Sequence, residues 1–186
     1  MAAILIEAPA SEPVSLLEAK NYLRVQHDAD DALIGAMISA ARVQVESLTR
    51  RALITQTWRI VLDRWPSSGV ISSPISPLRT VAAARVRDQI GYVQALDTEI
   101  FLANTASSPG LISFDAGRVT QPAQTIAGIE IDIEVGYGNT ADVPAPLVQA
   151  IRLLLARAYE YRGDPRSEAI PAGIDALIAP YRVVLL

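Results

Sequence analysis

The sequence predicts an α+β fold, mainly α, in which two long helices and some shorter ones form a small bundle. A β-rich insertion separates the N-terminal helices from the C-terminal helices. Two observations lead to this prediction. Apolar residues recur every three or four positions near both ends of the chain, as they do in helices with one buried face. Between these stretches the pattern changes to short runs of β-branched residues separated by glycine and proline, which is typical of strands and turns.

Length and composition fit one domain with its own core. The chain has 186 residues, and 51% of them are hydrophobic while only 5% are aromatic, so aliphatic side chains must fill most of the core. We expect five parts along this single domain. They are an N-terminal arm (1–13), a helical part (14–52), the β-rich insertion (53–138), a second helical part (143–180) and a C-terminal tail (181–186).

Two helices are predicted in the first helical part. Ser15 and Glu18 form the pattern S-x-x-E of a capping box, which predicts a helix from Ser15 to about Arg24. A longer helix is expected over about 30–49, because aspartates precede it, where negative charge complements the helix dipole, and its apolar residues keep one face. The positions expected on that buried face are Leu33, Ile34, Met37, Ile38, Ala41, Val45 and Leu48.

The middle of the chain is predicted to be a series of strands. A first strand is expected at Thr55–Leu62 and is followed by a breaker-rich segment. Further strands are expected at Thr80–Arg87, Gly91–Leu96, Glu99–Leu102 and Leu111–Phe114. The most regular pattern is Ile129–Val135, where apolar and acidic residues alternate. It predicts a half-buried strand whose acidic side chains lie on a solvated outer face. These acidic residues are Glu130, Asp132 and Glu134.

The C-terminal part is predicted to hold one long and one short helix. Pro144 and Pro146 suit a first helical turn, and Gly163 is the expected C-terminal cap. The residues expected to be buried are Leu147, Ile151, Leu154, Leu155 and Ala158. A short helix over 174–179 precedes Pro180, and the chain then ends on an apolar run. Such a run either folds back onto the core or docks on a partner, and the sequence leaves both alternatives open.

Residue types and spacings argue against an enzyme. The chain has no cysteine, which excludes thiol nucleophiles and thiolate metal sites. His27 is the single histidine, and we expect it to be an exposed loop residue. The aspartates beside it do not form a calcium loop, because Leu33 and Ser39 stand at the sixth and twelfth positions counted from Asp28. We therefore expect no catalytic residue, no cofactor, no metal and no membrane partner.

Charge argues against sequence-specific DNA binding. The formal net charge is −4, whereas DNA-binding proteins carry a basic surplus. The first two helices could form a helix-turn-helix, but aspartates at the start of the second helix would repel phosphates. A helical DNA-binding regulator is therefore the less favoured alternative. Arg50 and Arg51 follow that helix, where they either interact with its negative end or, together with Glu46, form salt bridges between subunits.

A series of short motifs follows a characteristic order along the chain. The motifs are Ser15–Lys20, Leu23-Arg24, Asp30-Asp31, Ala40-Ala41, Val45-Glu46, Arg51–Leu53, Gln56–Trp58, Gly136–Gly138, Val143-Pro144, Ala150-Ile151, Tyr159–Gly163, Leu177 and Pro180–Arg182. Each motif alone is weak, but the order and spacing of the whole series are specific. The series resembles one family, the head–tail connector or adaptor proteins of long-tailed phages, prophages and gene transfer agents.

The resemblance implies a structural role in virion assembly. Such adaptors form a ring, typically dodecameric, beneath the portal protein. The ring lies in the neck of a virion or gene-transfer-agent particle, and the particle is assembled in the bacterial host cytoplasm. The ring extends the DNA channel toward the stopper or another tail-side neck protein, and DNA passes through it non-specifically. An acidic chain suits this role, because a basic channel would hold the phosphate backbone.

The resemblance also implies partner-binding residues. C-terminal segments of such adaptors often engage the portal, so we expect this chain's tail to bind the portal or a neighbouring subunit. The tail residues are Tyr181, Arg182, Val183, Val184, Leu185 and Leu186. The closest alternative is another neck component, a stopper or tail-completion protein, whose usual β-barrel folds agree less well with long helices.

Overall fold

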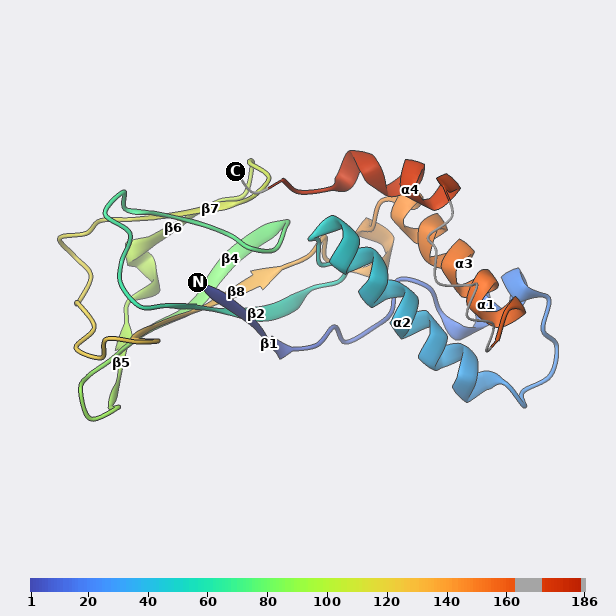
Figure 1. The fold of residues 1–186 in the computed structure, drawn as a ribbon, viewed down its shortest axis with the longest axis horizontal. Helices are drawn as coiled ribbons and strands as arrows, with labels where there is room; N and C mark the ends of the chain where they lie inside the picture. Colours follow the sequence, from blue (N-terminus) through green and yellow to red (C-terminus); the bar gives the residue numbers. More distant parts are fainter. Residues whose placement is uncertain (163–171, 185–186) are drawn as a thin grey trace. The chain divides into compact units, whose positions relative to one another are not determined.

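The computed structural model describes residues 1–162 and 172–184, which divide into two compact units (Figure 1). The β unit contains residues 1–9, 55–136 and 183–184, and the α unit contains the described residues of 10–54 and 137–182. Among the described residues there are four α-helices and two antiparallel sheets. The α+β class is therefore confirmed, but the expected predominance of helix is not, because the middle of the chain forms two sheets.

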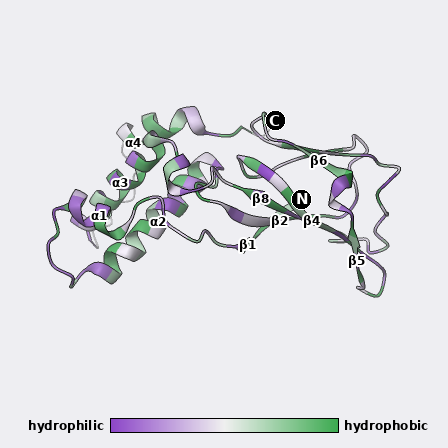
Figure 2. Cartoon of the chain, turned by 180° about the vertical axis from the view of Figure 1, so that it is seen from behind, coloured by the Kyte–Doolittle hydropathy of each residue, from purple (hydrophilic) through white to green (hydrophobic). Residues whose placement is uncertain are grey.

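The α unit is built from helices that share one apolar core. In Figure 2 the helices alternate between hydrophobic and hydrophilic colouring, as expected of elements with one buried face. The helices are α1 (Leu16–Leu23), α2 (Asp31–Thr49), α3 (Ala145–Glu160) and α4 (Ala172–Ile178), with short 3-10 turns at Thr140–Asp142 and Ala179–Tyr181. The largest fully buried side chains of this core are Ile34, Leu53, Leu147, Ile151, Leu155, Ile174 and Ile178.

The capping box predicted at the start of α1 is confirmed. The Glu18 carboxylate accepts the backbone N–H of Ser15 at 2.9 Å, and the Ser15 hydroxyl oxygen accepts the backbone N–H of Glu18 at 3.3 Å. These hydrogen bonds lower the pKa of Glu18, so its carboxylate stays ionised at the positive end of the helix. The helix ends at Arg24, which adopts a left-handed conformation with φ 58°.

Two residues expected in the buried faces of the two long helices are exposed instead. Leu33 is 39% exposed, because its neighbour Ile34 points into the core and successive residues of a helix point about 100° apart. Ala158 is exposed because the buried face of α3 ends at Leu155, one turn before the helix itself ends. Of the remaining positions expected on these faces, Met37 and Leu48 are half-buried and the rest are buried.

The β unit contains a five-stranded sheet and a three-stranded sheet, both antiparallel. The five-stranded sheet has the order β1 (Ala2–Glu7), β2 (Gln56–Leu62), β8 (Ile129–Val135), β4 (Leu78–Arg87) and β5 (Val93–Leu96). The three-stranded sheet has the order β3 (Val70–Ser72), β7 (Leu111–Phe114) and β6 (Phe101–Asn104). A cluster of three aromatic rings, Trp65, Phe101 and Phe114, is buried in this unit, with centroids 4.9–6.1 Å apart.

Most predicted strands are present within two residues of their expected bounds. The segment Glu99–Leu102 differs, because it begins as a 3-10 turn at Thr98–Ile100 and becomes strand β6 only at Phe101. Two strands were not predicted. β3 lies inside a segment rich in proline and glycine, and β1 lies in the stretch expected to be an arm. β1 pairs with β2 along one edge only, and none of its side chains is buried.

Strand β8 is buried on both faces, so the prediction of a solvated acidic face is wrong. Its apolar residues Ile129, Ile131, Ile133 and Val135 are fully buried, as expected. On the opposite face Glu130 is only 8% exposed and Asp132 only 6% exposed. The reason is that β8 lies between β2 and β4, whose arginines cover this face.

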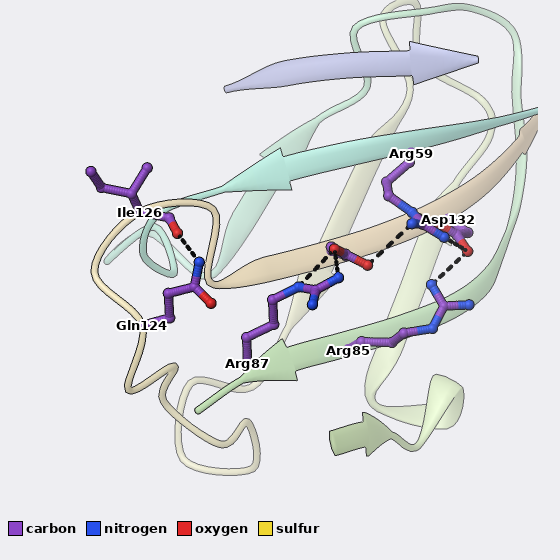
Figure 3. Close-up of polar contacts among 7 residues, drawn as sticks. Arg59, Arg85, Arg87, Gln124, Ile126 and Asp132 are labelled. Carbon is purple, nitrogen blue, oxygen red and sulfur yellow. Dashed lines mark hydrogen bonds and ion pairs between the residues drawn. The ribbon is translucent and has the colours of Figure 1, made fainter. Parts of the chain in front are cut away.

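Three arginines and two carboxylates form what we call the charge ladder: Arg59 of β2, Arg85 and Arg87 of β4, and Glu130 and Asp132 of β8 (Figure 3). Arg59 donates two hydrogen bonds to Asp132, at 2.7 and 3.1 Å, and Arg85 donates a third at 2.7 Å. Arg87 donates two hydrogen bonds to Glu130, at 2.6 and 2.9 Å, and Arg59 lies 3.2 Å from the same carboxylate. The ladder therefore joins three neighbouring strands.

The ladder keeps its buried carboxylate ionised. Burial alone would raise the pKa of Asp132, but hydrogen bonds from Arg59 and Arg85 outweigh this effect, and the pKa of Asp132 is lowered. The hydrogen bond to Asp132 likewise raises the pKa of Arg59. An ionised carboxylate removed from water must be paired to be tolerated, and these arginines supply the pairing.

We predict that Asp132→Asn destabilises the protein in a pH-dependent way, because it leaves Arg59 and Arg85 facing a neutral amide. At pH 7 the free energy of unfolding should fall by about 1–3 kcal/mol, the usual contribution of hydrogen bonds to charged groups. Since the folded-state pKa is lowered, the ionised carboxylate stabilises the fold above its unfolded-state pKa of about 3.9. This contribution to the free energy of unfolding is lost as the pH falls through the folded-state pKa of Asp132, which is lower than the unfolded-state pKa. Urea unfolding from pH 7 to pH 3 should show the two proteins converging below about pH 4.

The control for this prediction is Glu134→Gln, on the same face of β8 but only partly buried. We expect it to change the free energy of unfolding by less than about 0.5 kcal/mol at every pH. Equal losses in the two variants, or a loss in Asp132→Asn that does not depend on pH, would contradict the role given to the ladder.

Candidate partner-binding surfaces

The C-terminal segment begins in the α unit. After α4 the chain makes the short turn Ala179–Tyr181, and the Arg182 guanidinium lies 2.6 Å from the Asp175 carboxylate. The backbone carbonyl of Tyr181 accepts a hydrogen bond of 2.6 Å from the Arg51 side chain. The beginning of the predicted partner-binding tail is therefore fixed by contacts within its own chain.

The next two tail residues differ in their exposure. Val183 is 8% exposed, and Val184 is 69% exposed. Leu185 and Leu186 lie outside the described residues. Val183 therefore follows the first of the two alternatives, folding back onto its own chain, whereas docking on a partner stays a prediction for the exposed Val184.

Arg51 connects several parts of the α unit. It follows Arg50, which ends α2 in a left-handed conformation with φ 55°. The Arg51 guanidinium lies 6.0 Å from the centre of the Tyr137 ring, within reach of a cation–π contact. Burial raises the pKa of Tyr137, and the positive charge of Arg51 opposes that shift. Arg51 therefore links the end of α2 to Tyr137 and to the C-terminal segment.

Glu46 belongs to a polar network on α2 with Arg42 and Glu12. The Arg42 guanidinium donates to Glu12 and to Glu46, each at 2.7 Å, and the second Glu46 oxygen accepts the backbone N–H of Leu53 at 2.9 Å. Burial alone would lower the pKa of Arg42, but the hydrogen bond that Arg42 donates to Glu12 and the charge of Glu46 outweigh this effect, and the pKa of Arg42 is raised. Of the three residues considered for contacts between subunits, Glu46 and Arg51 thus have partners in their own chain, and Arg50 is exposed.

Arg42 and Glu12 were not among the residues predicted from the sequence to have a function. The spacing of Arg42 and Glu46, four residues apart on one helix, is a signal for an ion pair. Glu12 could not be found in this way, because it lies 30 residues from Arg42 in a segment without regular structure.

The acidic loop before α2 is neutralised by neighbouring side chains. The Lys20 ammonium lies 2.6 Å from Asp28 and 2.7 Å from Asp31. Asp30 accepts a hydrogen bond of 2.6 Å from the Tyr159 hydroxyl, which lowers the pKa of Asp30. His27 is exposed, as the sequence suggested. Within residues 1–162 and 172–184, no group of three or more histidines and carboxylates is arranged to hold a metal ion.

No helix in the described part of the chain is long and apolar enough to cross a membrane. The contacts above are ion pairs, hydrogen bonds and aromatic contacts that hold the chain together.

Comparisons with known proteins point to one kind of particle. The family model for phage gp6-like head-tail connector proteins matches residues 13–88. No curated protein matches the sequence. Among solved structures, a chain from the neck of an empty GTA particle computed with C6 symmetry has 28% identity and a TM-score of 0.84, and covers 100% of this chain and 97% of its own.

Two further solved structures agree with the first. A chain from the virion of a native gene transfer agent (GTA) particle has 29% identity and a TM-score of 0.82. A chain from the neck of a native GTA particle computed with C12 symmetry has 27% identity and a TM-score of 0.83. Both cover 100% of this chain and 97% of their own. The resemblance of the sequence to head–tail connector proteins is therefore confirmed.

We predict that Arg51→Ala loosens the C-terminal segment. The variant loses the hydrogen bond to the Tyr181 carbonyl and the contact with Tyr137, which together should lower the free energy of unfolding by about 1–2 kcal/mol. Hydrogen exchange at residues 179–182 should become faster, as measured by mass spectrometry. The control Arg50→Ala removes a neighbouring exposed arginine and should leave both quantities nearly unchanged. Similar exchange rates at 179–182 in the two variants would show that Arg51 does not anchor the segment.

Proposed function

We propose, from the premise that this chain is a structural head–tail connector protein, that twelve copies of it form a ring beneath the portal protein of a phage-like particle. The ring joins head to tail and continues the DNA channel toward the stopper or another tail-side neck protein. The observation that carries this proposal is the similarity over the whole chain to neck proteins of gene transfer agents, one of them in a neck computed with C12 symmetry.

The distribution of charge supports passage of DNA without binding. The net charge is −4, and many arginines are already paired with carboxylates of their own chain. These arginines include Arg42, Arg59, Arg85 and Arg87. A surface of this kind offers few free positive charges to the phosphate backbone, so it would not hold DNA in transit.

The partner-binding residues expected from the sequence remain part of this proposal. The tail Tyr181–Leu186 would bind the portal or a neighbouring copy, and the exposed side chain of Val184 is its most accessible described position. Arg50 is exposed at the end of α2 and could reach a neighbouring copy directly. Glu46 and Arg51 would act indirectly, by fixing the backbone around Arg50.

We predict that Val184→Asp prevents heads from joining tails. A charged side chain in an apolar contact is costly, so the yield of joined particles should fall at least about tenfold. The experiment is complementation of particle production in cells that lack the natural gene, with joined and separate heads counted by electron microscopy. A point variant is sharper than removal of Tyr181–Leu186, because that deletion also removes the carbonyl that Arg51 binds.

The control for Val184→Asp is Ile126→Asp, a 73% exposed position of the β unit. It should join heads to tails as well as the natural chain does. If Val184→Asp also joins normally, the tail is not the docking segment. If cells without the gene still produce joined particles, the proposed connector role itself is wrong.

We also predict that the purified chain is monomeric or only weakly associated, and that the portal templates its ring. The largest buried aliphatic side chains fill the two cores, and exposed ones such as Leu17, Ile90 and Leu102 come from separate segments, so none of them alone provides the roughly 800 Å² per partner of a stable interface. Sedimentation velocity at low micromolar concentration should show a species near the mass of one chain, 20.0 kDa. A stable ring under these conditions would contradict the prediction.

A further inference from the structure

The outer face of α2 carries no charged residue. Its exposed positions are Ala32, Leu33, Ala36, Ala40, Val43, Gln44 and Ser47. The only charged residues between Asp31 and Arg50 are Arg42 and Glu46, and both are held in the network with Glu12. A helix that faces water normally carries charged residues on that side. This face is uncharged over about four turns of helix, so it is suited to contact with another protein.

A shallow groove runs along the second half of this face. It has a volume of about 560 Å³. The residues that line it are Ser39, Ala40, Val43, Gln44, Ser47 and Leu48. Val43 is 54% exposed in the groove. All six lining residues come from one helix, so the groove does not enclose a ligand in the way that small-molecule sites do. Three of the lining side chains, Ser39, Ala40 and Ser47, are small and allow close approach of another helix.

The same unit carries an apolar projection on a different helix. Leu17, in the first turn of α1, is 70% exposed, and its neighbour Leu16 is 37% exposed. Leu17 is the most exposed leucine in the described helices. The capping box between Ser15 and Glu18 fixes the backbone from which it projects. A rigidly held, exposed leucine is an effective anchor for an apolar groove.

The expected occupant of the groove is a second copy of this chain. In a ring with rotational symmetry, each copy must present two different surfaces, one to the neighbour on each side. The similar chains come from necks computed with C6 and C12 symmetry. An uncharged groove on α2 and an uncharged projection on α1 are two such surfaces. DNA is excluded as occupant, because the groove has no positive charge to contact phosphates.

We propose that, in the assembled ring, the α2 groove of each copy receives Leu17 of the neighbouring copy. This inference rests on the proposed connector function and specifies the contact between subunits. The surface that the groove and Leu17 could bury is small compared with the roughly 800 Å² that each partner buries in a stable complex. The contact therefore forms in the ring, where the portal brings the copies together, and not between free chains.

Cysteine cross-linking tests the contact directly, because the natural chain has no cysteine. Particles are assembled from a mixture of chains with Leu17→Cys and chains with Val43→Cys, and are mildly oxidised. A disulfide between these positions can then form only between different chains. We expect covalent dimers on non-reducing gels from the mixture, and monomers from particles that contain either variant alone.

The matched control mixes Leu17→Cys with Leu102→Cys, a 72% exposed position on β6, and should give no dimers. If the first mixture gives no dimers although the chain is present in the particle neck, the proposed contact is wrong and the connector function stands. If the chain is absent from the neck, the connector function fails instead.

A second test places a charge in the groove. Ala40→Arg should reduce the yield of joined particles at least about tenfold, because the arginine would be buried without a partner. Ala158→Arg, the same substitution at an exposed position of α3, should stay within about twofold of the natural chain. Both variants should keep their melting temperature, since arginine is a good helix former. Normal joining by a stably folded Ala40→Arg variant would overturn the proposal.

Discussion

The fold of the β unit depends on the burial of both faces of strand β8. One face packs four aliphatic side chains into the core, and the other places two carboxylates beneath arginines from both neighbouring strands. Removing an ionised carboxylate from water costs several kcal/mol unless it is paired, so the acidic face is stable only when β2 and β4 lie on either side in their observed register. The ladder thus selects one strand arrangement, because a shift by one residue would turn the arginines to the wrong face.

Arginines are also paired with groups of their own chain inside the α unit, though fewer residues take part. Arg42 is 9% exposed on α2 and is held between Glu12 and Glu46, while Arg51 joins the end of that helix to Tyr137 and the C-terminal segment. In both units, then, several arginines form ion pairs or hydrogen bonds within their own chain, and part of the exposed surface is uncharged. This distribution of charge fits the proposed ring around DNA, because the arginine charges are neutralised within each chain and would not attract the phosphate backbone.

The sequence predicted what depends on local periodicity and missed what depends on distant partners. The capping box of α1 and the apolar face of β8 could be predicted, because their signals lie within a few neighbouring residues. The acidic face of β8 was predicted to be exposed to solvent. The alternation of apolar and acidic residues shows that the strand has two different faces, but it does not show which side chains cover the acidic face. Asp132 pairs with Arg59 across 73 positions of the chain, and no pattern in one sequence indicates that pairing. The strand β1 was missed for the same reason: its partner β2 lies about fifty residues later.

The two ends of the long insertion meet, and this has a consequence for how the chain can change. Gln56 lies opposite Val135 in the β2–β8 pair, and two residues further out the backbone N–H of Tyr137 donates to the carbonyl of Leu53 at 3.3 Å. The entropy of closing the intervening loop is therefore offset by strand pairing inside the loop itself. For the helices on either side, the insertion behaves like a tight turn, whatever its length. Lineages could lengthen, shorten or redecorate the outer strands while the helical framework keeps its connectivity unchanged.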